Sequence, residues 1–258
     1  MAARTLSDRE LLEIELETLW ERNAAGRLVK SAGSNGGLAP DLVVAIAGDV
    51  AIPAFGTDLP DALAKELGDL PSAEQPYLAR TALVPGSEPL PSFIEDLRQR
   101  LSAALGPLEV ASGPNYVCEA PPALPGLAGL IRSDDPSADF SRLAPPADAG
   151  WTAEEWELLL SSQLGPWAAV TVNGEVAALC FCARLTDLAA EAGVRTEPAH
   201  RRQGHAAAVT AAWAAQVLAT GRVAFYSTSA DNVASQGVAA RLGLRPIGWI
   251  WQLSHATG

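Results

Sequence analysis

Cysteine and histidine are scarce in the sequence, and these are the residues that form disulfides in secreted proteins and bind metal ions. Its 258 residues include 3 cysteines, too few and odd in number for the disulfide framework of a secreted domain. Cys180 and Cys182 lie two apart, a spacing that places both on one face of a strand and indicates packing. The 3 histidines, His200, His205 and His255, form no ligand-spaced cluster with these cysteines. We therefore expect no metal site.

Long apolar runs and a targeting segment are missing as well. No apolar run approaches the roughly 20 residues that cross a bilayer. The N-terminal stretch MAARTLSDRELLEIELE is too acidic for a signal or transit peptide. We therefore expect a cytoplasmic protein without a membrane partner.

Positive charge is scarce and unevenly spread. The net charge is −12, and 48% of the residues are hydrophobic, enough for a sizeable core in one or two domains. Residues 1–150 carry 11 Lys and Arg against 22 Asp and Glu, net −11, whereas residues 151–258 carry 7 against 8, net −1. This balance argues against a nucleic-acid partner. The acidic half is either a solvated surface that aids solubility or a surface that attracts a cationic substrate.

The first half of the chain predicts a mixed α/β domain of unknown role. Ser7 and Glu10 form a capping box ahead of a helix that we expect to end at Gly26. An extended segment follows at residues 41–55, and two helices at 58–67 and 91–105 have proline near their starts. Prolines and glycines then crowd together, which predicts a boundary near residue 120 and two domains, 1–120 and 121–258.

The second half gives sharper signals. Thr152 and Glu155 form another capping box. Asn173-Gly174 separates two strand-like segments and predicts a hairpin with a type I′ turn. The remaining patterns predict the order β-β-β-α-β-α-β, with strands at 166–172, 175–185, 188–196, 223–229 and 246–253 and helices at 204–221 and 232–243. In the last strand, Trp249 and Trp251 share one face and predict packing in a core or an interface.

The stretch HRRQGHA joins the third of these strands to the long helix. The first turn of a helix has backbone N–H groups without intrahelical partners, and the helix dipole adds to their attraction for an anion. Gly204 and Ala206 leave room for a phosphate near the main chain, and Arg201 or Arg202 can add charge-assisted contacts. The alternative is an arginine-flanked helix start in contact with solvent. Neither a Walker loop nor the dinucleotide fingerprint G-x-G-x-x-G is present.

Taken with the order of the elements, GVRTEPAHRRQGHAAAVTAAWA and DNVASQGVAARLGL resemble the GNAT superfamily of acetyl-CoA-dependent N-acyltransferases, over roughly residues 125–258. The extended N-terminal half resembles an uncharacterised bacterial branch. The resemblance implies an α/β (α+β) fold: a mixed, mostly antiparallel twisted sheet with a splayed central strand pair, flanked by helices. It also implies acetyl-CoA as cofactor, bound by the splayed strand, the loop and the second helix at Val194, Arg195, Thr196, Arg201, Arg202, Gln203, Gly204, His205, Ala206, Asn232 and Ser235.

N-acylation requires an amine that loses a proton and attacks a thioester. Glu191, three residues before Val194, is the candidate general base, and the Val194 amide the candidate donor to the carbonyl oxygen. The alternative for Glu191 is a surface or salt-bridged carboxylate. Many relatives place a tyrosine where this sequence has Ala239. Either the thiolate leaves without protein help, since thiols ionise near pH ~8.5, or a hydroxyl serves as the acid, with candidates Ser229, Ser235 and Tyr226.

Three functions remain open on the sequence. The first is acetyl transfer to a primary amine of a small, cationic molecule by a monomer or homodimer. The second is acetylation of a protein lysine or N-terminus, and the third is a non-catalytic acyl-CoA-binding sensor. Acceptor contacts of this superfamily come from variable loops, so the sequence does not identify the acceptor.

Overall fold

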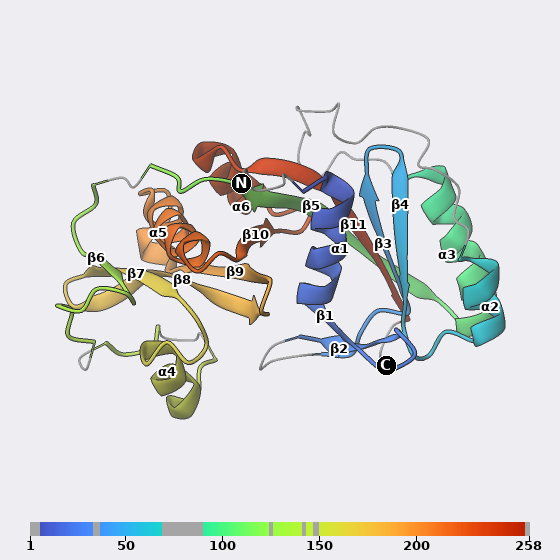
Figure 1. Ribbon diagram of the computed structural model, residues 1–258, viewed down its shortest axis with the longest axis horizontal. Helices are drawn as coiled ribbons and strands as arrows, with labels where there is room; N and C mark the ends of the chain where they lie inside the picture. Colours follow the sequence, from blue (N-terminus) through green and yellow to red (C-terminus); the bar gives the residue numbers. More distant parts are fainter. Residues whose placement is uncertain are drawn as a thin grey trace. The chain divides into compact units, whose positions relative to one another are not determined.

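The computed structural model of the chain describes residues 6–32, 37–68, 90–123, 126–140, 143–146 and 150–255 (Figure 1). Two compact units are present. Unit 1 comprises Met1–Tyr116, Ser227–Gln236 and Pro246–Gly258, and unit 2 comprises Val117–Tyr226 and Gly237–Arg245. The sequence predicted one boundary near residue 120 and a single domain for 121–258, whereas two C-terminal segments belong to unit 1.

Unit 1 begins with the predicted capping box. The Ser7 side chain accepts from the Glu10 amide, and α1 runs over Asp8–Leu19. The prediction that this helix ends at Gly26 is wrong, because Trp20 is already extended and starts β1 (Trp20–Arg22), which pairs antiparallel with β2 (Leu28–Ser31). Gly26 has φ +77°, so its conformational freedom serves the turn of this hairpin.

Four strands in the order β4-β3-β11-β5 form the sheet of unit 1. β3 (Leu42–Ala47) and β4 (Val50–Phe55) form a hairpin within the predicted extended segment, and β3 also pairs antiparallel with β11 (Arg245–His255). β5 (Leu108–Cys118) was not predicted from the sequence, because glycine and proline within it are typical of irregular chain. The predicted helices are α2 (Asp61–Glu66) and α3 (Ser92–Leu105).

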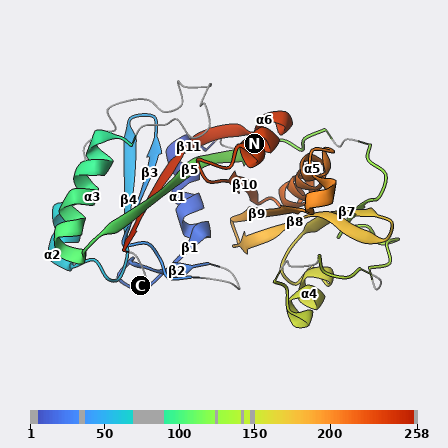
Figure 2. The same cartoon turned by 180° about the vertical axis from the view of Figure 1, so that it is seen from behind.

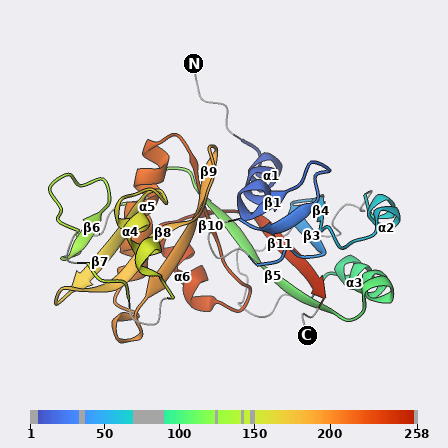
Figure 3. The ribbon, with the colours of Figure 1, turned by 90° about the horizontal axis from the view of Figure 1, so that it is seen from below.

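The core of unit 1 lies between the sheet and α2 and α3. Leu42, Val44 and Ile46 alternate along β3 and pack with Ile94 and Leu101 of α3. Trp249 and Trp251 belong to the same core, each 3% exposed, which confirms the predicted packing. Figures 1 and 2 show α1 on the opposite side of these strands from α3, and α2 and α3 lie side by side in Figures 1 and 3.

Unit 2 holds the strand order β10-β9-β8-β7-β6. The predicted hairpin is confirmed: Asn173 has φ +54° and Gly174 φ +85°, the left-handed pair that a type I′ turn requires. All pairs are antiparallel except β9 with β10. Two elements of unit 2, β10 and α6, extend into unit 1. The elements of unit 2 are β6 (Leu130–Arg132), α4 (Ala153–Leu160), β7 (Trp167–Val172), β8 (Glu175–Leu185), β9 (Ala189–Thr196), the 3₁₀ turn Pro198–His200, α5 (His205–Ala219), β10 (Val223–Ser227) and α6 (Val233–Leu242).

Helices cover both faces of the unit 2 sheet. Trp156 and Leu159 of α4 pack with Trp167 of β7 and Leu179 of β8. α5 lies on the other side of β7 and β8, as Figure 1 shows. The fold class is therefore the mixed, mostly antiparallel α/β arrangement that the sequence predicted. No helix within the described ranges is long and apolar enough to cross a membrane.

Candidate functional site

The parallel pair β9–β10 separates part of the way along its length. Ala189, Ala190 and Glu191 pair with β10, and Phe225 is the partner of Glu191. Beyond Glu191 no further β9–β10 pair occurs among the described residues, although β9 stays paired with β8 as far as Thr196. Burial changes at the same residue: the segment 189–191 is buried, and 192–196 is partly exposed. The backbone of 192–196 is thus available on one side for a ligand to complete the sheet.

The other side of Glu191 carries a second irregularity. Cys182 pairs with Ala192 and Arg184 pairs with Glu191, so β8 contains one extra residue at this point. Such a bulge bends a strand and redirects side chains, and bulges are enriched beside active sites. Glu191, only 3% exposed, therefore lies where β8 bulges and β10 diverges.

The predicted cofactor segment Val194–Thr196 follows on β9. These three residues pair with Cys180, Leu179 and Ala178 of β8. The Arg195 guanidinium forms an ion pair with Glu197 at 3.0 Å. The structure therefore places the segment on the part of β9 that diverges from β10, and its contact with a cofactor stays a prediction.

The loop before α5 has the backbone shape of an anion site. Arg202 has φ +59° and Gly204 φ +85°, and alternation of left-handed residues with ordinary ones turns successive N–H groups toward one concavity. No side chain caps α5, because its N-cap is Gly204. Arg201 Nε donates to the Thr196 carbonyl at 3.4 Å, and Gln203 Nε2 to the Ala199 carbonyl at 3.3 Å. The uncapped first turn, which includes Ala206, can receive an anion.

His205 lies within the helix predicted over 204–221. It is the first residue of α5 and is 6% exposed. Burial, with a smaller contribution from His200, lowers its pKa. Within the described residues its Nδ1 atom has no hydrogen-bond partner. The imidazole therefore stays neutral near pH 7, and its Nδ1 is a buried polar atom without a described partner at the start of α5.

The predicted residues Ser229, Asn232 and Ser235 lie in a different unit from Glu191, namely unit 1. The Asn232 side chain accepts from the Ser235 amide at 3.0 Å and so caps α6. The Ser229 hydroxyl donates its proton to the Asp231 carboxylate at 2.6 Å. In this arrangement the hydroxyl does not offer that proton to a leaving thiolate. Ala239, in unit 2, is fully buried, and its methyl group offers no acid. The structure gives Asn232 a capping role, and its cofactor role stays a prediction.

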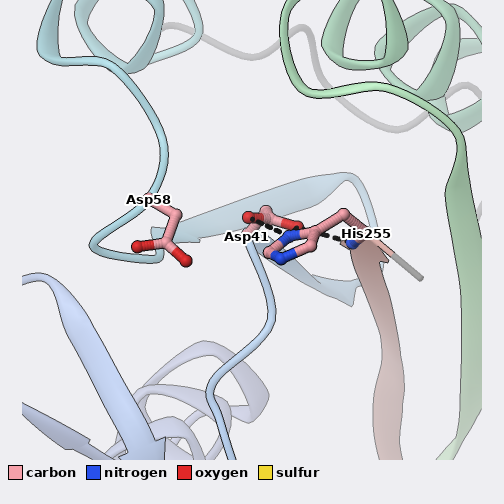
Figure 4. Close-up of side chains that lie close together, drawn as sticks. All are labelled: Asp41, Asp58 and His255. Carbon is pink, nitrogen blue, oxygen red and sulfur yellow. Dashed lines mark hydrogen bonds and ion pairs between the residues drawn. The ribbon is translucent and has the colours of Figure 1, made fainter. Parts of the chain in front are cut away.

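A cluster of titratable side chains in unit 1 was not predicted from the sequence. Asp41, Asp58 and His255 offer ligand atoms that all lie within 4.8 Å of one another (Figure 4). Asp41 is 3% exposed, and its carboxylate accepts from the His255 amide at 2.7 Å and from the ring Nδ1 at 2.9 Å. His255 thus occupies both Asp41 oxygens, since Nδ1 also lies 3.1 Å from Oδ1. The cluster connects the end of β11 to the start of β3. No local sequence pattern predicts this pairing of distant residues.

This contact predicts a pH-dependent stability. The hydrogen bond to Asp41, then its charge and that of Asp58, raise the pKa of His255. A raised folded-state pKa contributes stability that is full below the unfolded pKa of about 6.5 and is lost as pH rises through the folded value. The melting temperature of His255→Gln should therefore fall further below wild type at pH 5.5 than at pH 9. A difference between the two proteins that is the same at both pH values would contradict this role.

Comparison with known proteins matches residues 161–248 to the GNAT acetyltransferase family model, which confirms the resemblance for this segment. Solved structures that match the chain include a GNAT-family acetyltransferase from Novosphingobium aromaticivorans (22% identity, TM-score 0.43, covering 58% of this chain and 66% of that one). Another, from Colwellia psychrerythraea, has 20% identity and TM-score 0.41 and covers 57% and 56%. A GCN5-related N-acetyltransferase from Kribbella flavida has 16% identity and TM-score 0.47 and covers 99% and 98%. No curated protein matches the chain.

Proposed function

We propose that this chain, whose residues 161–248 match the GNAT acetyltransferase family model, moves an acetyl group from acetyl-CoA directly to a primary amine of a small cationic molecule. The observation that carries the proposal is the coincidence at Glu191 of a buried carboxylate, the end of β9–β10 pairing and the β8 bulge. A carboxylate beside a strand segment open to a ligand is the arrangement that proton removal from a bound amine requires.

The loop residues fit the phosphates of coenzyme A. Gly204 has no Cβ, its φ is +85°, and the uncapped N–H groups of α5 favour a doubly charged pyrophosphate. Arg201 and Arg202 are exposed and add positive charge to the same loop. In the proposal, Val194, Arg195 and Thr196 hold the pantetheine arm through their backbone, as a missing strand would.

Bound acetyl-CoA supplies a thioester whose C–S bond breaks as the amine nitrogen bonds to the carbonyl carbon, with coenzyme A leaving as a thiolate. Glu191 accepts the proton that the amine gives up. Because this carboxylate is 3% exposed, the proton reaches it through water or after a local opening of the strand pair. The Val194 amide is the proposed donor to the carbonyl oxygen. Departure as a thiolate agrees with two features of the chain. Ala239 has no acidic group that could protonate the sulfur, and the Ser229 hydroxyl already donates its proton to Asp231.

A turnover assay tests this function directly. Thiol release from acetyl-CoA is measured with polyamines, aminoglycosides, uncharged and acidic amines, and lysine peptides. The proposal predicts turnover with the small polycationic amines. Turnover with peptides alone would make the protein a lysine or N-terminal acetyltransferase, and coenzyme A binding without turnover of any amine would make it a sensor.

Acceptor capture should depend on salt. The net charge of −11 in residues 1–150 raises the local concentration of a polycationic amine, and salt screens this attraction over a Debye length of ~8 Å at physiological ionic strength. We expect kcat/KM for the best acceptor to fall as salt rises, and to fall when the exposed Glu17, Asp49 and Asp96 are changed together to amides.

A matched set separates this attraction from a general effect of charge. The exposed Glu157, Glu175 and Asp187 of unit 2, changed together to amides, remove the same charge. This second variant should keep more of the wild-type kcat/KM than the first. Equal losses in the two variants, or a flat salt dependence, would show that the acidic half has no part in acceptor capture and would leave solubility as its role.

A further inference from the structure

Arg241, in the last turn of α6, brings a guanidinium group to the start of α5. A Cβ placed on Gly204 would meet Arg241 Nη1 at 3.2 Å and Nη2 at 3.4 Å. Both residues belong to unit 2, and both lie within the segment that matches the GNAT model. The guanidinium therefore sits against the N-cap residue of the helix whose first turn is uncapped.

The guanidinium of Arg241 has no acidic partner among the described residues. Within the described part of the chain, its side chain makes no ion pair and no hydrogen bond. Three other arginines of unit 2 have partners: Arg195 pairs with Glu197, Arg245 pairs with Glu119 at 2.9 Å, and Arg222 Nε donates to the Thr186 carbonyl at 2.8 Å. An exposed arginine held beside uncapped helix amides is placed to receive an external anion.

A second feature at this helix start points to a ligand. The His205 side chain is more than nine-tenths buried, and its Nδ1 has no hydrogen-bond partner among the described residues. A buried polar atom without a partner is unfavourable, and such atoms in native proteins are commonly satisfied by a bound group or water. The left-handed φ of +59° at Arg202 is also strained for a residue with a side chain.

We propose that Arg241 is a binding residue for the pyrophosphate of coenzyme A, acting with the loop Arg201–Ala206. The inference rests on the proposed function, since it takes the anion to be the phosphate part of an acyl-CoA. A guanidinium offers two parallel N–H groups to phosphate oxygens, a geometry that lysine lacks. Because the Arg241 guanidinium lies beside Gly204, we assign it to the phosphate group that the α5 amides bind in this proposal. That group is the pyrophosphate and not the 3′-phosphate.

The test is isothermal titration of wild type, Arg241→Ala and Arg241→Lys with coenzyme A, dephospho-coenzyme A and pantetheine. Arg241→Ala should weaken coenzyme A and dephospho-coenzyme A alike, by about 10-fold or more, as loss of a charge-assisted hydrogen bond implies. Its pantetheine affinity should not change. Arg241→Lys should weaken binding less, because the charge and its favourable position at the helix C-terminus remain. Arg245→Ala, which removes the same charge from an arginine paired with Glu119, is the control and should bind like wild type.

The outcomes separate this inference from the function on which it rests. If wild type binds coenzyme A and Arg241→Ala binds it equally well, Arg241 has no part and the proposed function stands. A loss for coenzyme A alone would assign Arg241 to the 3′-phosphate and overturn the pyrophosphate assignment. If wild type binds no coenzyme A, the proposed function and this inference fall together. Should Arg241→Ala fail to fold, an Arg241→Lys affinity equal to wild type for all three ligands would overturn the bidentate contact.

Discussion

Glu191→Gln is expected to lower kcat by ~10²–10⁴-fold, the usual contribution of a general base, and to leave coenzyme A affinity unchanged. Glutamine has nearly the same shape as glutamate and fits the buried position between Arg184 of β8 and Phe225 of β10. It has no basic oxygen with which to take the amine proton. The rate that remains should also lose the acidic limb of its pH profile, because that limb reports the protonation of the base.

The measurement combines steady-state kinetics from pH 5 to 9 with coenzyme A titration and a melting curve. Glu175→Gln makes the same chemical change at the exposed start of β8 and should behave as wild type. If Glu191→Gln keeps the wild-type rate and pH profile, the catalytic assignment fails. If it loses coenzyme A affinity and thermal stability together with rate, Glu191 is a structural residue of the strand junction.

The second large effect concerns the anion site itself. Gly204→Glu should weaken coenzyme A binding by at least about 100-fold, equivalent to ~2.7 kcal/mol. Three causes act together. The φ of +85° is unfavourable for any residue with a Cβ. That Cβ would meet the Arg241 guanidinium at 3.2 Å. The new carboxylate would place negative charge at the helix start and take Arg241 as its partner.

A control for backbone strain is available in the same unit. Gly174, in the β7–β8 turn, has the same φ of +85° and no heavy atom within 4 Å of an added Cβ. Gly174→Glu therefore imposes the same local strain and charge away from the loop, and coenzyme A affinity should be retained. Isothermal titration of both variants decides: equal affinities for coenzyme A would remove the loop from the binding site.

Local signals accounted for most of the second half of the chain. The Thr152 capping box, the Asn173-Gly174 turn and the period of the strands depend on neighbours a few residues away, and the structure has each of them. The left-handed residues Arg202 and Gly204 give the Arg201–Ala206 loop the backbone shape of an anion site, and its binding of an anion stays a prediction. For such features, the interactions that form the structure are also the ones visible in a short window of sequence.

Features that depend on distant residues were missed. Trp20 looked helical by period, but pairing with Ser31 draws it into a hairpin, since tertiary pairing overrides weak helix propensity. β5 contains Gly113 and Pro114, residues that usually interrupt strands; at Gly113 an added Cβ would meet the Thr228 carbonyl oxygen at 1.8 Å, so the glycine is needed for close packing. Arg241 lies far from Gly204 in the sequence, and no spacing rule joins them.

The return of Pro246–Gly258 to unit 1 has a consequence for synthesis of the protein. β3 pairs with β11, and Asp41 and His255 bond across a separation of 214 residues. The chain emerges from the ribosome N-terminus first, so β3 and β4 emerge long before β11. The apolar edge of β3 therefore stays unpaired until β11 has been synthesised. Contacts of such high sequence separation form slowly and leave edges open to aggregation in the meantime. We therefore expect the sheet of unit 1 to be completed only after β11 has been synthesised. A chaperone that shields the β3 edge should then raise the yield of native protein more than one that acts on unit 2.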